Sequence, residues 1–222
     1  MSPTNQEKIR RRNDPRDTST LRKSEQTRQA ILDGALKFLW TQPFRELTVA
    51  DLMSLTGTSR SAFYQYFSDL HDLIETLLHD LQGEILTVAE PWFHGEGDPV
   101  SLLEESLSGL VKVCHRRGPL IRAVVDAAPM DERLEKAWTG FLKVFDDAVA
   151  ERIEEHQAAG LIPSFDARPV AIALNRMDVG VMVHHFGRRP RSQPELVRQS
   201  ITRIWISTLY GGPSAARESK SR

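Results

Sequence analysis

Residues 47–67 carry the clearest fold signal in the chain, and they read LTVADLMSLTGTSRSAFYQYF. Thr48 suits the N-cap of a helix over 49–55, because its hydroxyl can accept a hydrogen bond from an amide of the first turn. Gly57 then allows a backbone conformation that a residue with a Cβ resists, so a tight turn is expected there. A second short helix follows over 59–67. Two helices joined by such a turn form a helix-turn-helix, whose second helix enters the major groove of DNA.

The second helix of this pair presents polar side chains on one face. Apolar side chains of 49–55 can pack against Phe63, which leaves hydroxyls, an amide and a guanidinium toward solvent. These groups match the hydrogen-bonding needs of phosphates and base edges, and Arg60 can bind a guanine through two hydrogen bonds. Tyr66 fits a core position as well as a phosphate contact. The candidate DNA-binding residues of this helix are Ser59, Arg60, Ser61, Tyr64, Gln65 and Tyr66.

The same stretch resembles the signature of the TetR family of transcriptional regulators. The resemblance rests on T-V-A-D-L at 48–52 and G-T-S-R-S-A-F-Y-Q-Y-F at 57–67. It implies that Ser59, Arg60, Ser61, Tyr64 and Gln65 face the major groove, and that Thr48, Tyr64 and Tyr66 hold phosphates. The chain departs from the family where Leu70 replaces a lysine that anchors a phosphate. His71, or the N-terminus of the next helix, is the substitute that we expect.

Apolar residues at helical spacing continue almost to the end of the chain, and no segment favours a β-strand. We therefore expect an all-α fold of about nine helices, with a three-helix DNA-binding head and a C-terminal ligand-binding and dimerisation body. PWFHGEGD at 91–98 is interpreted as a loop. The expected helices cover 24–42, 49–55, 59–67, 69–90, 99–116, 119–128, 131–159, 167–186 and 194–211.

Charge and composition divide the chain in the same way. Residues 1–70 carry 11 Lys or Arg against 8 Asp or Glu, whereas the remainder carries 18 against 22. A mildly basic head on an acidic body fits a protein that touches phosphates at one end, although so small a difference also arises by chance. The expected domains are a disordered basic arm, a DNA-binding domain, an effector-binding and dimerisation domain, and a disordered tail, at 1–23, 24–70, 71–212 and 213–222.

The body resembles the ethionamide-resistance repressor (EthR-like) branch of the family. The matching segments are A-W-T-G-F-L-K at 137–143, A-L-N-R-M-D at 173–178 and I-W-I-S-T-L-Y-G at 204–211. The resemblance implies a long apolar tunnel between 99–116, 131–159 and 167–186 that admits elongated hydrophobic molecules. The pocket residues that it implies are Leu103, Leu107, Leu110, Trp138, Phe141, Leu142, Asn175, Asp178, Val183 and Trp205.

Two polar residues set the expected chemistry of this pocket. Asn175 would hydrogen-bond a carbonyl or amide of the effector. Asp178 stands where the family branch has an amide, so it either forms a salt bridge, for instance with Arg176 or Arg122, or favours a cationic or hydrogen-bond-donating ligand. Leu103 and Leu110 replace aromatic residues, which predicts a wider and less aromatic pocket. The same apolar stripe is also what an ordinary helical core contains.

We expect a ligand-responsive regulator, most simply a repressor, with no cofactor and no metal. A homodimer through 167–186 and 194–211 would bind a palindromic operator in double-stranded DNA, and a small apolar effector would shift it to another state. The alternative is a helical small-molecule-binding or adaptor protein whose head does not bind DNA. Activation in place of repression is also open.

Other classes of protein find little support. No apolar run reaches the length that spans a bilayer, and no secretory signal is evident, so a cytoplasmic protein without a membrane partner is expected. Enzymatic activity is not expected, because Cys114-His115 and His184-His185 are adjacent pairs whose side chains diverge on a helix.

Overall fold

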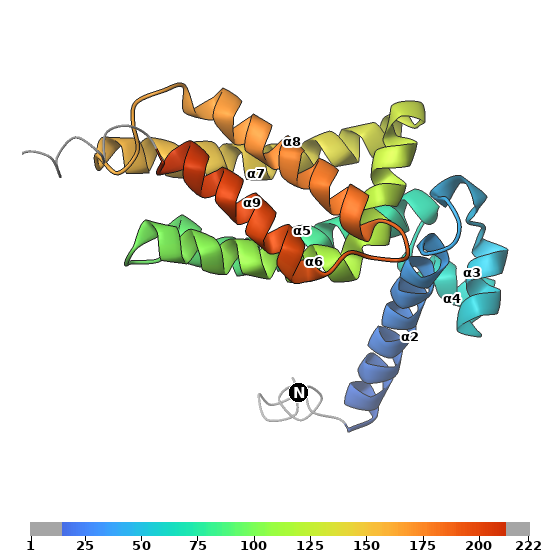
Figure 1. Cartoon of the computed structure of the whole chain (residues 1–222). Helices are drawn as coiled ribbons and strands as arrows, with labels where there is room; N and C mark the ends of the chain where they lie inside the picture. The colour runs from blue at the N-terminus through green and yellow to red at the C-terminus, as the bar shows by residue number, and fades with distance from the viewer. Residues whose placement is uncertain (1–14, 212–222) are drawn as a thin grey trace, which may run out of the picture.

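The computed structural model describes residues 15–211, with side chains from Arg22 onward. These residues form eight α-helices and two short 3-10 helices and contain no strand, which confirms the all-α prediction. Figure 1 shows a head at one end of an elongated helical body. The elements are α2 (Pro15–Leu39), η2 (Phe44–Glu46), α3 (Val49–Thr56), α4 (Arg60–Tyr66), α5 (Leu70–His94), α6 (Pro99–Ala127), η3 (Ala128–Met130), α7 (Glu132–Ala158), α8 (Ala167–Phe186) and α9 (Pro194–Leu209).

The turn that joins α3 to α4 forms as its residues predict. The hydroxyl of Thr48 accepts a hydrogen bond from the amide of Asp51 at 3.1 Å, and that of Ser59 accepts one from the amide of Ala62 at 3.1 Å. Gly57 adopts φ 66°, the left-handed conformation that favours glycine. α3 and α4 therefore each begin at an N-cap side chain that binds an amide of the first turn.

The first helix is longer than its sequence pattern predicts. α2 begins at Pro15, so the prediction of disorder through residue 23 is wrong for 15–23. Proline suits the first turn, where its missing amide hydrogen is not needed, and the polar residues that follow tolerate a solvated helix. The rest of the predicted arm, with Arg10 to Arg12, and the predicted tail at 213–222 lie outside the described residues.

A single helix, α6, replaces the two that were predicted over 99–128, so the body has one helix fewer. Pro119 lies inside α6 and cannot donate to the carbonyl of His115, four residues earlier. Arg191 donates to that carbonyl instead, at 2.7 Å. Gly118 also has to be small here, because a Cβ would lie 2.3 Å from the carbonyl oxygen of Phe186. Tertiary contacts thus hold the helix together at its proline.

α5 likewise runs through the predicted loop as far as His94. Pro91 interrupts its backbone hydrogen bonds, and Ser106 of α6 compensates. The Ser106 hydroxyl accepts a hydrogen bond from the amide of Trp92 at 3.1 Å and donates to the carbonyl of Ala89 at 3.3 Å. Trp92 and Phe93 consequently lie on a helix and are buried.

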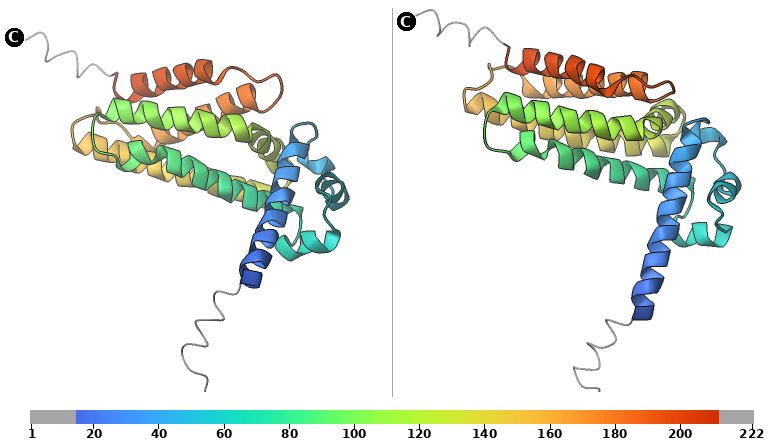
Figure 2. Two further views of the ribbon diagram at one scale, coloured as in Figure 1. Left: turned by 90° about the horizontal axis from the view of Figure 1, so that it is seen from below. Right: turned by 60° about the horizontal axis from the view of Figure 1, so that its bottom comes forward.

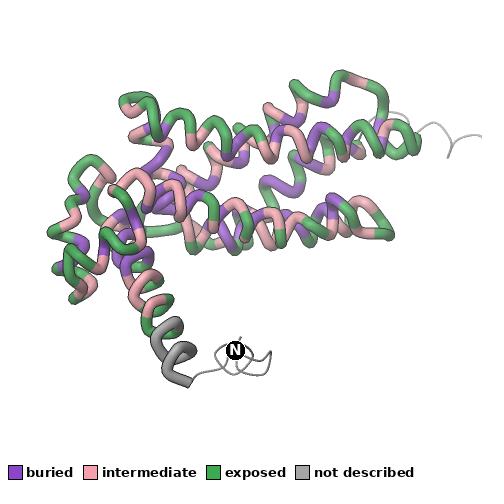
Figure 3. Tube along the Cα trace, turned by 180° about the vertical axis from the view of Figure 1, so that it is seen from behind, coloured by how far each residue is buried: buried purple, intermediate pink, exposed green. Residues whose placement is uncertain are grey.

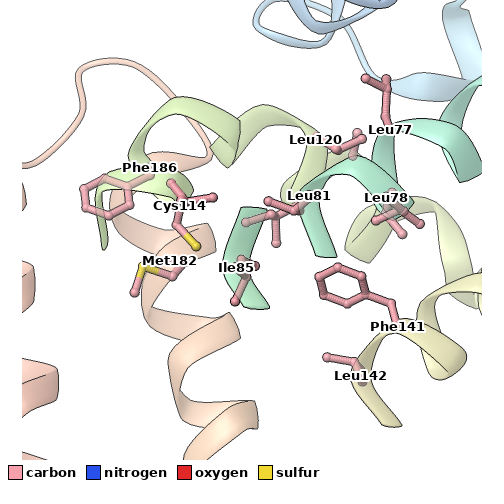
Figure 4. Close-up of a cluster of buried hydrophobic side chains, with 14 of the residues drawn as sticks. Leu77, Leu78, Leu81, Ile85, Cys114, Leu120, Phe141, Leu142, Met182 and Phe186 are labelled. Carbon is pink, nitrogen blue, oxygen red and sulfur yellow. The ribbon is translucent and has the colours of Figure 1, made fainter. Parts of the chain in front are cut away.

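The body packs α5 against α6, with α7 and α8 on the same bundle and α9 against α6 (Figure 2). The sides of the helices that face each other are buried, and the outer sides are exposed (Figure 3). Figure 4 shows part of this core, in which Ile85 of α5 lies near Phe141 of α7. Because α5 starts directly after α4 and continues into the core, a single helix connects the two parts of the molecule.

Candidate functional site

The outer face of α4 is polar and accessible. Phe63 and Phe67 are buried, whereas Tyr64 keeps 59% of its surface exposed. Only the α4 residues that point away from the head core are available to DNA. The predicted contacts Ser59, Arg60, Ser61, Tyr64 and Gln65 are all exposed in this way.

Two further predicted phosphate contacts have structural partners. Thr48 is exposed, and its hydroxyl also donates to the Asp51 carboxylate at 2.5 Å. Tyr66 is half-buried, and its hydroxyl lies 3.1 Å from the hydroxyl of Ser24 on α2. Thr48 is therefore accessible to a partner, while the Tyr66 hydroxyl links α4 to α2.

His71 faces the body of the protein. Its Nε2 lies 2.6 Å from a carboxylate oxygen of Asp131, and its ring meets that of Phe44 edge-on. This contact lowers the pKa of Asp131. The structure thus gives His71 a protein partner in the place where the sequence predicts a phosphate, and Leu70 beside it is half-buried.

A cavity of about 100 Å³ lies in the body, and five helices line it. Eight of the ten predicted pocket residues belong to its wall: Leu103, Leu107, Leu110, Phe141, Leu142, Asn175, Asp178 and Trp205. Trp138 does not line the cavity but stacks on Phe141, which does, with ring centroids 5.1 Å apart. Val183 is half-buried elsewhere on α8. The cavity is smaller than the roughly 300 Å³ at which drug-sized pockets begin. An elongated ligand therefore requires the helices to move apart.

The residues that the sequence did not reveal come mainly from α5. Ile85, Ala89, Trp92 and Phe93 line the cavity, as do Ser106, Phe145 and Val149. Trp92 and Phe93 add rings to the wall beyond those that the sequence predicted. The signal for them was helical spacing that continues past Pro91, which we interpreted as a break. Whether the pocket is wider and less aromatic than that of its relatives stays a prediction.

Among the residues that the structure describes, no cation pairs with the carboxylate of Asp178. Arg176 pairs with Asp146 at 2.9 Å, and Arg122 donates to the carbonyl of Leu39 at 3.1 Å, so neither predicted salt bridge of Asp178 forms. Trp205 instead donates its indole N–H to the two carboxylate oxygens, at 3.3 and 3.2 Å. Burial raises the pKa of Asp178 to about 7, and this hydrogen bond opposes the shift.

Asn175 is tied to the same ion pair. Its amide nitrogen donates to Asp146 at 2.9 Å, and Asp146 is buried. This bond fixes the orientation of the amide group, because a carboxylate only accepts. The side-chain carbonyl of Asn175 and its second N–H are left for a ligand.

Several contacts join the head to the body. Arg133, near the start of α7, donates to Asp69 at 2.8 Å and to Glu75 at 2.6 Å. Arg189 lies over the ring of Trp40, 4.8 Å from its centroid. Arg133 thus links α7, which also lines the cavity, to the N-terminal part of α5, directly after α4.

The cysteine and histidine residues that were considered as signs of an enzyme do not form a catalytic site in the described structure. Cys114 is buried, and burial raises the pKa of its thiol, which disfavours a thiolate nucleophile. His115 packs edge-on against Phe186. In the described part of the chain no three His, Cys, Asp or Glu side chains are grouped as a metal site requires. None of the described helices has the length and hydropathy of a membrane span.

Comparison with known proteins finds a matching family for the head and another for the body. Residues 31–77 match the family "Bacterial regulatory proteins, tetR family", and residues 103–211 match "Transcriptional regulator EthR, C-terminal domain". The chain is similar to the HTH-type transcriptional regulator EthR of Mycolicibacterium smegmatis, with 27% identity over 89% of this chain and 93% of the relative. The EthR of Mycobacterium tuberculosis is 26% identical over 89% and 94%.

Solved structures share the fold. A TetR-family transcriptional regulator from Syntrophomonas wolfei superposes with a TM-score of 0.68, at 17% identity, over 82% of this chain and 94% of that chain. The likeness therefore extends through the head and the helical body together.

Proposed function

Since the chain belongs to the TetR family of transcriptional regulators, in its EthR branch, we propose that the exposed face of α4 binds operator DNA and that the body cavity receives a small effector. The observation that supports DNA binding best is the exposure of Arg60, Tyr64 and Gln65 on a helix anchored by the buried Phe63. We assign DNA binding to 24–70 and effector binding to the body.

A dimer through α8 and α9 completes the proposal. These helices lie on one side of the body (Figure 1). α9 also exposes Leu196 and Ile204, with 59% and 43% of their surfaces accessible. Exposed apolar side chains on helices that are otherwise packed favour a partner. A two-fold dimer presents two copies of α4, which requires a palindromic operator with half-sites about 34–36 Å apart. Such a regulator works in the cytoplasm, where the operator is.

The effector would act by a population shift. Its cavity is lined by α5, α6, α7, α8 and α9, and α5 continues directly from α4. A ligand that prefers a wider cavity favours another position of α5 and hence another spacing of the two heads. A coupling of about 1–3 kcal/mol changes operator occupancy several-fold or more.

The direct test uses DNA that flanks the protein's own gene, in fluorescence anisotropy at a stated salt concentration. The double variant Arg60→Ala with Tyr64→Ala is expected to weaken binding about 100-fold or more, because each base contact is worth about 1–3 kcal/mol. Lys112→Ala is the matched control, since Lys112 is a cation exposed on the body. Equal affinity of the double variant and the wild type would contradict the proposal.

A second candidate function is a ligand-binding adaptor without DNA affinity. Two observations favour it: Leu70 replaces the anchoring lysine, and His71 is bonded to Asp131. In that case no intergenic fragment binds, at low or moderate salt, while ligands still enter the cavity.

A further inference from the structure

Most hydrogen-bond donors in the cavity wall are already used, and the exception is the second N–H of Asn175. Ser106 donates to the carbonyl of Ala89, and the indole of Trp205 donates to Asp178. The indole of Trp92 donates to the hydroxyl of Tyr210 at 3.0 Å. Apart from that N–H, the polar groups with capacity left for a ligand are acceptors.

Two such acceptors lie on α8, one helical turn apart. The Asp178 carboxylate receives only long hydrogen bonds from one indole, and the Asn175 carbonyl is left free when its amide nitrogen binds Asp146. A carboxylate offers about four acceptor positions, so most of those on Asp178 stay available. A ligand that matches this wall has to donate hydrogen bonds.

The wall also carries one uncompensated acidic group. Asp178 is the only titratable residue among the fifteen that line the cavity, and it is 7% exposed. Asp146 of α7 is paired with Arg176, the thiol of Cys114 on α6 stays neutral, and α5 and α9 contribute apolar and indole groups. Burial of a carboxylate without a cation is costly, and a bound cation removes that cost.

Aromatic rings surround the same space. Trp92 and Trp205 meet edge-on with centroids 5.7 Å apart, and Phe141 and Phe145 with centroids 5.1 Å apart. The faces of such rings attract an ammonium group, and the attraction is stronger away from water. Aromatic rings around one carboxylate form a cation site with apolar walls.

We propose that the effector of this protein is a compact apolar amine, whose ammonium group pairs with Asp178 and donates to Asn175 while its apolar part packs on the aromatic wall. The inference rests on the proposed function only where it calls the amine an effector. The amine site itself is argued from the cavity alone. The volume of about 100 Å³ limits the apolar part to about one ring unless the helices separate.

The test compares three probes of one shape by isothermal titration of the full chain at pH 8: benzylamine, benzyl alcohol and benzamide. Benzylamine carries a positive charge, whereas the other two are neutral. We expect benzylamine to bind the wild type at least about tenfold more tightly than benzyl alcohol. Asp178→Asn is expected to abolish that preference. Glu151→Gln, which removes an exposed carboxylate of α7, is expected to keep it.

A second measurement needs no variant. Because the pKa of Asp178 is about 7, an amine has to displace a proton at pH 6 and does not at pH 8. We expect about tenfold weaker benzylamine binding at pH 6, with release of up to one proton, detected by titration in two buffers of different ionisation enthalpy.

A control accompanies the variant in the first measurement. Benzyl alcohol binding to Asp178→Asn shows whether that variant is folded.

The outcomes separate the two proposals. Equal binding of benzylamine and benzyl alcohol, no benzylamine binding, or an unchanged preference in Asp178→Asn would each overturn the amine site. Preferential binding of benzamide to the wild type would overturn it too, because a protonated Asp178 would then act as the donor. If benzylamine binds as expected but operator DNA does not, the proposed function fails and the amine site remains.

Discussion

The proposed DNA-facing surface and the body cavity are built in different ways. The surface takes most of its side chains from one seven-residue helix, which one buried ring anchors, while Ser59 and Thr48 are helix caps beside it. The cavity takes fifteen residues from five helices, and its polar groups depend on partners elsewhere. The geometry of the surface site therefore depends mainly on its one buried anchor residue. The geometry of the cavity depends on the relative positions of all the helices that line it. The predictions below test this difference.

The largest effect is expected at the anchor. Phe63→Ala should lower the free energy of unfolding by about 3–5 kcal/mol, because Phe63 is fully buried and its removal leaves a cavity in a small core. Urea denaturation followed by circular dichroism measures the change. Gln65→Ala, on the exposed face of the same helix, is the control and should stay within about 0.5 kcal/mol of the wild type. Similar losses in both variants would show that the head has no dominant anchor.

An effect of intermediate size, a gain in stability where Phe63→Ala gives a loss, is expected from a substitution in the cavity. Asp178→Asn should stabilise the protein by about 1–3 kcal/mol at pH 8, because it removes a buried charge that has no cation. The folded-state pKa of about 7 lies above the ordinary value of 3.8, so the folded protein binds the proton more tightly. Wild-type stability due to this group is thus greatest at acidic pH and falls as pH rises from about 4 to 7.

Comparing the stability of the wild type with that of Asp178→Asn isolates the contribution of this carboxyl group from those of all other titratable groups. Thermal unfolding at pH 8 should show a higher midpoint for Asp178→Asn, and this advantage should shrink toward pH 5. A variant that is less stable than the wild type at pH 8 would mean that the carboxylate is better compensated than its hydrogen bonds indicate.

The smallest effect is expected where the two regions meet. Arg133→Ala removes the contacts with Asp69 and Glu75, which are partly exposed and worth less than about 1 kcal/mol. Operator affinity without ligand should change by no more than about threefold. The reduction of operator affinity by saturating benzylamine should become smaller, because α7 is less firmly linked to α5. An unchanged ligand response would place the coupling elsewhere, for instance at Arg189 and Trp40.

The helix-turn-helix was predictable because its determinants are local. Thr48, Gly57 and Ser59 act within three residues of themselves, as caps or as a turn, and the alternation around Phe63 separates the core from the surface. The exposure of Arg60 and Tyr64 follows from that pattern alone. His71 was harder, because its partner Asp131 lies sixty residues away.

The cavity was predictable only in part. The resemblance to EthR located eight wall residues, but it missed α5, because Pro91 looks like the end of a helix when Ser106 is not known to support it. Pro119 was misjudged in the same way, since Arg191 compensates for it from a distant loop. The sequence also left open whether Asp178 forms a salt bridge.

The amino-acid sequence by itself determined the helical periodicity, the caps, the turn at Gly57 and the polar face of α4, because these depend on interactions between near neighbours. Only the tertiary structure decided which prolines interrupt a helix, which arginine pairs with Asp146, and that Asp178 stays without a cation. The physical reason is that a backbone carbonyl or a buried charge is satisfied by whatever group the fold brings near it, at any separation along the chain.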